Sequence, residues 1–189
     1  MRIIAGEARG RRIEAPAGRD TRPTLDRVRE NLFNMLQGEI EGRKILDLFA
    51  GSGALSFEAL SRGAESACLA DHDRKAIAAE RRNAEALGYQ DRIRIFPTDW
   101  RKALKELERD GACFDIVFLD PPYAMLALGE VFSELRSVID RDTLIILEHE
   151  AGKTPETGEG FVRVKQRSWG FCGVTIYRME ENGEGGERL

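Results

Sequence analysis

Five short apolar segments, each separated from the next by a stretch with helical periodicity, constrain the fold of this chain more than any other feature. The apolar segments are KILDLF at 44–49, SACLAD at 66–71, RIRIF at 92–96, FDIVFLD at 114–120 and TLIILEHE at 143–150. The intervening segments at 54–62, 74–87, 101–109 and 128–138 gather apolar or small residues on one helical face. This alternation predicts an α/β fold with a mostly parallel sheet, helices on both faces and right-handed crossovers.

The two ends of the chain add different elements. Near the C-terminus, FVRVKQR at 161–167 and VTIYRM at 174–179 alternate apolar and polar residues and are joined by SWGFCG. They predict an antiparallel hairpin at one sheet edge, which brings the sheet to seven strands. Near the N-terminus, TRPTLDRVRENLFNML at 21–36 predicts an amphipathic helix that is capped by Thr24, with Asp26 in its first turn.

The length of 189 residues allows one domain, residues 1–189, with a substantial core. We divide it into an arginine-rich arm and helix at 1–42, a catalytic α/β core at 43–179 and a flexible, Gly/Glu-rich tail at 180–189. Hydrophobic residues make up 42% and charged residues 33% of the chain, which excludes disordered and collagen-like classes.

The sequence favours a cytoplasmic protein. Its longest apolar run, 123–128, is six residues, whereas roughly 20 are needed to span a bilayer. The first residues, MRIIAGEARGRR, contain no apolar segment typical of a secretory signal. Three cysteines without CxxC spacing fit a reducing compartment, and with only two histidines we expect no metal site.

Positive charge is concentrated at the start of the chain. Residues 1–29 hold eight arginines and four acidic residues, while the remaining 160 residues hold 21 basic and 29 acidic residues. An arginine-rich arm can neutralise nucleic-acid phosphates locally even though the whole chain has a net charge of −4. Composition alone fits a solvated, flexible leader equally well.

The first apolar segment ends in the motif DLFAGSG. It places Asp47 at the carboxyl end of a strand and Gly51, Ser52 and Gly53 in the turn that opens the next helix, where ligands bind in open α/β sheets. Asp71, twenty residues after Gly51, can accept hydrogen bonds from ribose hydroxyls. The motif indicates a nucleoside-containing cofactor and leaves open a methyl donor, a dinucleotide or a purely structural turn.

The fourth apolar segment ends in Asp120, Pro121, Pro122 and Tyr123, at a strand end beside the same crevice. Because proline has no amide donor, the Asp120 carboxylate and the Pro121 carbonyl form a pair of acceptors that suits an exocyclic amine. Accepting both amine protons favours a pyramidal nitrogen that can attack a sulfonium methyl group, and Tyr123 could stack on the base. The alternative is that the two prolines only stiffen the connection from the strand to the following loop, and that Tyr123 packs in the core.

The chain resembles the S-adenosylmethionine-dependent amino-group methyltransferases and, within them, the bacterial 16S rRNA guanine-N2 methyltransferases of the RsmD family. The resemblance covers nearly the whole chain, and its carriers are MRIIAGEARGRRIEAP, TRPTLDRVRENLFNML, ILDLFAGSGALSFEALSRGA and FDIVFLDPPY. It implies a Rossmann-like class I methyltransferase fold. DPPY is typical of the wider superfamily, whereas the arginine-rich leader joined to RPT and RVRE is more specific.

The resemblance also implies roles for individual residues. Asp47 and the turn at 49–53 hold the methionine part of the cofactor, Asp71 its ribose and Asp99 its adenine amine. The implied cofactor-binding residues are Asp47, Phe49, Ala50, Gly51, Ser52, Gly53, Asp71, His72, Asp99 and Trp100. The implied catalytic residues are Asp120, Pro121, Pro122 and Tyr123, and the implied RNA-binding residues are Arg9, Arg11, Arg12, Arg22, Thr24 and Arg27.

Three positions depart from the family's pattern. Ser56 stands where glycine is usual, Asp71 replaces a glutamate and Trp100 replaces a small residue. None of them removes an acceptor that the chemistry requires. Glu58, in the helix after the glycine turn, is a candidate to brace the leader.

These observations predict a monomeric, metal-independent enzyme that transfers a methyl group from S-adenosyl-L-methionine to guanine N2 in 16S rRNA of the small ribosomal subunit. One alternative is an adenine-N6 methyltransferase, which would use the same acceptors, although no target-recognition insertion typical of DNA enzymes is visible. Another alternative is a non-catalytic RNA-binding assembly factor. A dinucleotide-dependent oxidoreductase does not explain DPPY.

Overall fold

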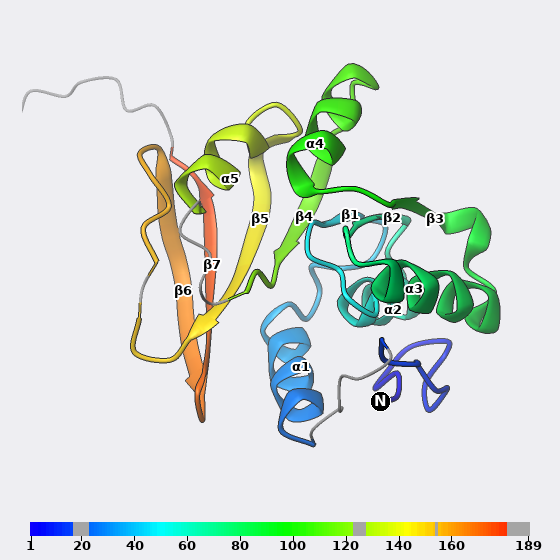
Figure 1. Cartoon of the computed structure of the whole chain (residues 1–189). Coiled ribbons are helices and arrows are strands. Elements are labelled where there is room, and N and C mark those ends of the chain that lie inside the picture. The colour runs from blue at the N-terminus through cyan, green and yellow to red at the C-terminus, as the bar shows by residue number, and fades with distance from the viewer. Residues whose placement is uncertain (17–22, 123–127, 154, 181–189) are drawn as a thin grey trace, which may run out of the picture.

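The computed structural model describes residues 1–16, 23–122, 128–153 and 155–180, with only the backbone described at 23–25 (Figure 1). Its helices are α1 (Pro23–Met35), α2 (Ala54–Ser61), α3 (Arg74–Leu87), η1 (Gln90–Arg92, a 3₁₀ turn), α4 (Trp100–Arg109) and α5 (Leu128–Leu135). Its strands are β1 (Lys44–Asp47), β2 (Ser66–Ala70), β3 (Ile93–Phe96), β4 (Phe114–Leu119), β5 (Ile139–Glu150), β6 (Phe161–Trp169) and β7 (Cys172–Met179). Most of the predicted tail, 181–189, lies outside the described residues.

The strands form one seven-stranded sheet in the order β3-β2-β1-β4-β5-β7-β6. Neighbouring strands among β1–β5 are parallel, whereas β7 is antiparallel to both β5 and β6. The predicted α/β fold and C-terminal hairpin are therefore confirmed. Because the order reverses between β1 and β4, their carboxyl ends flank a topological switch point, where ligands bind in such sheets.

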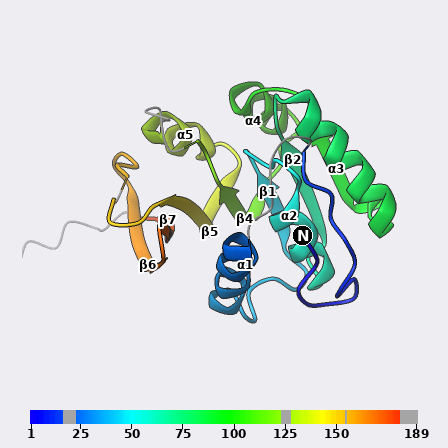
Figure 2. The ribbon, with the colours of Figure 1, turned by 60° about the horizontal axis from the view of Figure 1, so that its bottom comes forward.

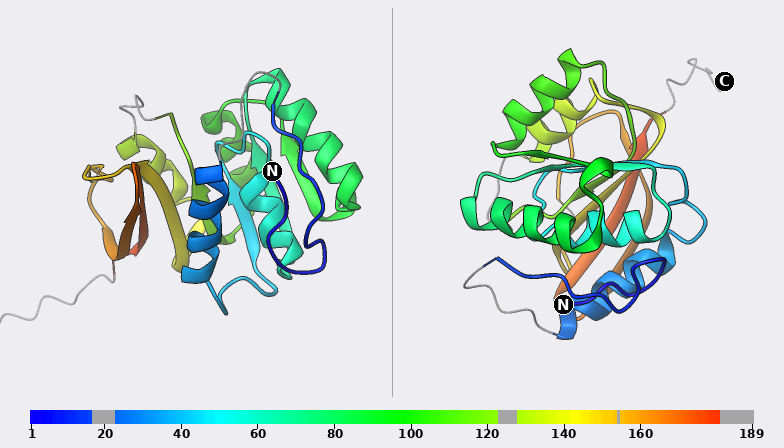
Figure 3. Two further views of the ribbon diagram at one scale, coloured as in Figure 1. Left: turned by 90° about the horizontal axis from the view of Figure 1, so that it is seen from below. Right: turned by 90° about the vertical axis from the view of Figure 1, so that its right-hand side faces the viewer.

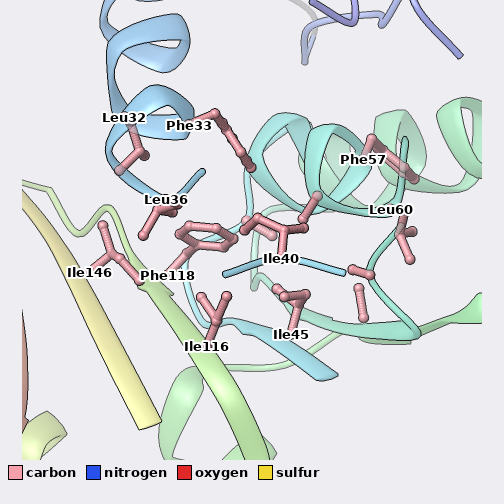
Figure 4. Close-up of a cluster of buried hydrophobic side chains, with 14 of the residues drawn as sticks. Leu32, Phe33, Leu36, Ile40, Ile45, Phe57, Leu60, Ile116, Phe118 and Ile146 are labelled. Carbon is pink, nitrogen blue, oxygen red and sulfur yellow. The ribbon is translucent and has the colours of Figure 1, made fainter. Parts of the chain in front are cut away.

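Two apolar layers cover the sheet because consecutive strand residues point to opposite faces. Ile45 packs on the side of α1, α2 and α3, while Leu46 packs on the side of α4 and α5. Figure 4 shows Phe33 of α1 and Leu36, just after the end of α1, pointing toward Phe118 of β4 in the first layer. The Phe33 and Phe118 ring centroids are 5.9 Å apart, within the range of favourable aromatic contacts.

Two boundaries differ from the predictions. The first helix begins at Pro23, so Thr24 lies in its first turn rather than at its cap; proline favours the first helical position because its missing N–H has no intrahelical partner there. The helix predicted for 128–138 ends at Leu135, and β5 begins at Ile139 rather than 143. An irregularity interrupts the β4–β5 pairing just after Ile139, where Asp140 accepts hydrogen bonds from the backbone amides of Asp142 and Thr143.

The first sixteen residues pack against the core alongside α2 and α3 (Figures 2 and 3). Ile3, Ala8 and Ile13 are buried, so the alternative of a solvated leader is wrong for this segment. Gly6 approaches α2 closely: with φ at +84°, a Cβ there would lie 1.8 Å from the Ser61 carbonyl oxygen. We call residues 1–16 the arm.

The arm is also held by a buried carboxylate, as its position in the sequence suggested. Glu58 of α2 is fully buried and accepts hydrogen bonds from the backbone amides of Ile4 and Ala5, at 2.7 and 3.1 Å. Its charge is balanced by Arg62 at 2.8 Å and by Arg29 at 4.0 Å. Glu58 therefore fixes the arm to the core.

Candidate active site

Two cavities meet at the carboxyl ends of β1 and β4. The larger, of about 740 Å³, lies over the ends of β1, β2 and β4 and the starts of α3 and α4. The smaller, of about 220 Å³, is enclosed by the arm, α1 and the glycine turn after β1. Phe49 and Asp120 line both cavities, so a ligand that occupied both cavities would lie against these two residues.

Asp71 and Asp99 bring carboxylates to the larger cavity. Asp71 accepts hydrogen bonds from the backbone amides of Gly51 at 2.9 Å and Asp73 at 2.8 Å, one on each oxygen. Asp99 caps α4 and accepts the amides of Arg101 and Lys102 on its Oδ1. Because a carboxylate oxygen has more than one acceptor site, these contacts orient both groups and leave capacity for a ligand.

Trp100 and His72 line the same cavity in different ways. The Trp100 ring is only 6% exposed, packs in the core beneath α4 and has the Arg101 guanidinium 4.3 Å from its centroid. The His72 side chain is 82% exposed, with Nδ1 4.0 Å from Asp71. Trp100 therefore forms a fixed wall, whereas His72 lies at the rim.

The glycine turn shapes the smaller cavity, which Ala50, Gly51 and Ser52 line. Gly53, at φ +74°, ends this turn and caps α2. A Cβ on Gly53 would lie 2.6 Å from the Phe57 ring, so only glycine fits between the turn and the core.

Asp47 is 2% exposed and also lines the smaller cavity. Burial raises the pKa of Asp47 to about 7; a hydrogen bond from Ser56 opposes this shift and the charge of Asp71 adds to it. The Ser56 hydroxyl donates to Asp47 Oδ2 at 3.0 Å. The serine that departs from the family's glycine is thus a partner of the buried carboxylate.

Asp120, Pro121 and Pro122 follow β4 directly. Asp120 and Pro122 are exposed, Pro121 is buried, and all three line the larger cavity. The structure therefore brings the predicted cofactor-binding and catalytic residues within 47–122 to one edge of the sheet. Tyr123 and Arg22 lie outside the described residues, as does the side chain of Thr24.

The predicted RNA-binding arginines divide into two groups. Arg9, Arg11, Arg12 and Arg27 are all exposed, and they differ in whether the guanidinium already has a partner in the protein. Arg11 donates to the carbonyls of Ala86 and Leu87 at the end of α3. It therefore has a structural role in holding the arm.

Sequence reasoning missed two polar residues that organise this site. Asn83 of α3 donates to the carbonyls of Glu14 and Ser52 and accepts the amide of Glu14. Arg29 of α1 is 6% exposed, lines the smaller cavity, and donates to the carbonyl of Arg2. A polar residue inside the otherwise apolar or small-residue face of its helix was the available signal in both cases.

A third missed residue is Glu80, which is fully buried in α3. Within the part of the chain that the structure describes, neither of its carboxyl oxygens has a hydrogen-bond partner. Burial raises the pKa of Glu80 to about 8, helped by the negative charges of Asp47 and Asp71. Glu80 is therefore mostly neutral at pH 7.

The described residues offer little other chemistry. No group of three or more His, Cys, Asp or Glu side chains there could hold a metal ion. Both ring nitrogens of the buried His149 are in hydrogen-bonding contact, with Thr175 and with the Glu150 carbonyl. No described helix is long and apolar enough to cross a bilayer.

A mostly parallel sheet that ends in an antiparallel hairpin, with a glycine turn and carboxylates at its switch point, defines a Rossmann-like class I methyltransferase fold. The family model described as "Conserved hypothetical protein 95" matches residues 1–178. The chain belongs to this family, and the resemblance to the RsmD family is confirmed.

Individual relatives cover nearly all of the chain. The YlbH protein of Bacillus subtilis is 38% identical over 182 residues, which are 94% of this chain and 98% of the relative. Ribosomal RNA small subunit methyltransferase D of Escherichia coli K12 is 35% identical over 187 residues, which are 97% and 92% of the two chains. The solved structure of the Escherichia coli yhhF protein is 34% identical, has a TM-score of 0.81 and covers 95% and 98% of the chains.

Proposed function

We propose that this protein transfers a methyl group from S-adenosylmethionine to the exocyclic N2 amine of a guanine in small-subunit ribosomal RNA. The observation that carries the proposal is the position of Asp120, which follows β4 and lines both cavities. An acceptor at this junction can hold the target amine next to the cofactor. The similarity to Ribosomal RNA small subunit methyltransferase D supports the RNA substrate.

The chemistry of the cavities fits S-adenosylmethionine. Asp71 and Asp99 offer acceptors for ribose hydroxyls and for the adenine amine in the larger cavity. Buried Asp47 suits the cationic amino group of the methionine part in the smaller cavity. When bound, the cofactor supplies a methyl group on a positively charged sulfur.

The chain's own contribution is to position and polarise the amine. The Asp120 carboxylate and the Pro121 carbonyl would accept the two N2 protons, since neither proline can donate a hydrogen bond. With both protons held, the nitrogen lone pair is directed away from the acceptors and toward the cofactor side of the junction. The walls formed by Phe49 and Pro122 would limit access of water.

Substrate binding would draw on the exposed arginines of the arm and α1. Arg9, Arg12 and Arg27 are available for phosphate contacts. The target base would leave its stack to reach Asp120, as in other enzymes that act on nucleobases.

The test is product identification. Purified protein is incubated with methyl-labelled S-adenosylmethionine and unmodified small subunits, naked 16S rRNA or duplex DNA, and the nucleosides are analysed by mass spectrometry. N2-methylguanosine from one RNA substrate is the expected result. Methyladenine would overturn the guanine assignment, and RNA binding without methyl transfer would support a non-catalytic assembly factor.

A further inference from the structure

A second acidic residue, Glu148, lies beside Asp120 where the two cavities meet. Strands β4 and β5 are parallel, with Leu119 opposite Leu147, so Asp120 and Glu148 occupy the next positions along neighbouring strands. Both line the smaller cavity. Glu148 also lines a small adjoining hollow together with Pro121 and Pro122. It therefore borders the place where the target base is expected.

A buried thiol on the neighbouring strand β7 lies close to this carboxylate. Cys172 of β7 is 1% exposed, and burial raises the pKa of its thiol, with further contributions from the charge of Glu148, a hydrogen bond to Glu148 and the charge of Asp120. The thiol stays protonated at neutral pH and can donate to Glu148. A protonated thiol of β7 therefore lies beside Glu148.

The base edges differ in a way that a second carboxylate can read. Guanine presents two adjacent donors, the N2 amine and the N1–H, whereas adenine presents its amine next to an unprotonated N1 acceptor. If Asp120 and Pro121 hold the amine, N1 of the base, which is next to the amine, would face the carboxylate of Glu148. A carboxylate, which has no proton to donate, stabilises N1–H and repels a bare N1 lone pair.

We propose that Glu148 selects guanine by accepting a hydrogen bond from its N1–H. This inference rests on the proposed guanine-N2 activity and adds the residue that distinguishes guanine from adenine. Glu148 acts on binding and alignment of the base rather than on the methyl group itself.

The experiment compares two target bases in two proteins. The RNA that wild-type protein methylates is prepared with guanosine or with 2-aminopurine riboside at the modified position; 2-aminopurine keeps the amine but has a bare N1. Methyl transfer is measured as kcat/KM for wild type and for Glu148→Gln. Glutamine keeps the size of the side chain and can donate to a bare N1.

Wild type should prefer guanosine, and Glu148→Gln should reduce that preference about tenfold or more, which is the size expected for losing one specific contact to a base edge. Most of the change should come from a lower kcat/KM on guanosine. Asp142→Asn is the matched control: Asp142 is an exposed carboxylate near the other end of the same strand, and it lines neither the cavity shared with Asp120 nor the hollow beside Pro121 and Pro122. It should leave the preference unchanged.

The outcomes separate the two proposals. If wild type forms no N2-methylguanosine, the proposed function fails whatever Glu148 does. If wild type forms it and Glu148→Gln keeps the wild-type preference, only the role of Glu148 is overturned. Unchanged cofactor affinity and thermal unfolding of Glu148→Gln exclude misfolding as the cause of a lost preference.

Discussion

Asn83 Nδ2 donates a 3.0 Å hydrogen bond to the backbone carbonyl of Ser52, 31 positions earlier in the chain. The same side chain binds both backbone polar groups of Glu14 in the arm. One amide in α3 therefore ties the arm to the turn that shapes the smaller cavity. The N-terminal segment is part of the candidate cofactor site as well as a carrier of positive charge.

Replacing Asn83 by alanine should loosen both the arm and the glycine turn. Because three hydrogen bonds are lost and buried backbone groups remain unpaired, we expect a loss of about 1–3 kcal/mol in the free energy of unfolding. Affinity for S-adenosylmethionine should fall in parallel. Urea unfolding and calorimetric titration measure the two effects.

Arg82→Ala provides the control on the same helix. Arg82 also binds Glu14, at 2.7 Å, but through an exposed ion pair, which contributes about 0–1 kcal/mol. Equal losses in the two variants would show that the buried amide has no special role.

Asp71→Ala and Asp120→Ala should separate cofactor binding from catalysis. The first should weaken S-adenosylmethionine binding by about 1–3 kcal/mol, the range for losing hydrogen bonds to a charged group. The second should abolish methyl transfer and leave cofactor affinity nearly unchanged, because Asp120 is assigned to the target amine. Calorimetry and a methyl-transfer assay on the same preparations test the pair, and equal losses of binding would refute the division of roles.

Cofactor affinity should depend on pH through Asp47. Burial raises the pKa of Asp47 to about 7, so many molecules carry a proton there at neutral pH. A bound cation favours the carboxylate, so binding below about pH 7 releases a proton and affinity rises with pH until it levels off above that value. Titrations in two buffers of different ionisation enthalpy count the released protons, and Asp47→Asn should show neither the release nor the slope.

Glu80 should make stability fall as pH rises. Burial raises its pKa from 4.5 to about 8, so the folded protein holds this proton more tightly than the unfolded chain. Its contribution to stability is complete below about pH 4.5 and is lost progressively up to about pH 8. Glu80→Gln should flatten the fall of unfolding free energy across this window by up to about 1.4 kcal/mol per pH unit.

Urea unfolding at several pH values tests the prediction for Glu80. Glu85→Gln, an exposed change on the same helix, should follow the wild-type curve. A Glu80→Gln curve parallel to wild type would mean that the buried carboxyl group is ionised in the folded protein.

We expect Arg9 and Arg12 of the arm to bind RNA phosphates, and we expect Arg11 not to. Neutralising exposed Arg9 and Arg12 should lower the slope of log K against log salt by roughly one to two units, since each lost phosphate contact removes about 0.7–0.9. Arg11 already donates to the carbonyls of α3, so Arg11→Gln should reduce stability and leave the salt slope nearly unchanged. Fluorescence anisotropy over a salt series distinguishes these outcomes, and identical slopes for all variants would remove the arm from the RNA surface.

The fold and the strand-end residues were accessible from sequence because their signals are local. Runs such as FDIVFLD predict buried strands, and parallel strands bring Asp47, Asp71 and Asp120 to one edge of the sheet. The packing of the arm was not predictable in this way. Ile3, Ala8 and Ile13 follow neither a helical nor a strand period, and their partners lie in distant parts of the chain.

The buried polar residues were missed for a related reason. Asn83 and Glu80 occupy a face of α3 that is otherwise mostly small and apolar, and composition does not reveal whether such residues have partners. Asn83 has three hydrogen bonds, whereas Glu80 has none among the described residues. Only the assembled structure shows that Asn83 ties the arm to the glycine turn. It also shows that Glu80 is a buried carboxyl group with a raised pKa.

The place of β7 in the sheet has a consequence for synthesis. Among the described residues it is the last strand in sequence order, yet it lies between β5 and β6. As the polypeptide leaves the ribosome, β1–β5 and the arm can assemble while the long edge of β5 stays open until residues 172–179 emerge. Open strand edges pair readily with other chains. A chain truncated before β7 would therefore keep the residues that line both cavities but leave the edge of β5 open to pairing with other chains.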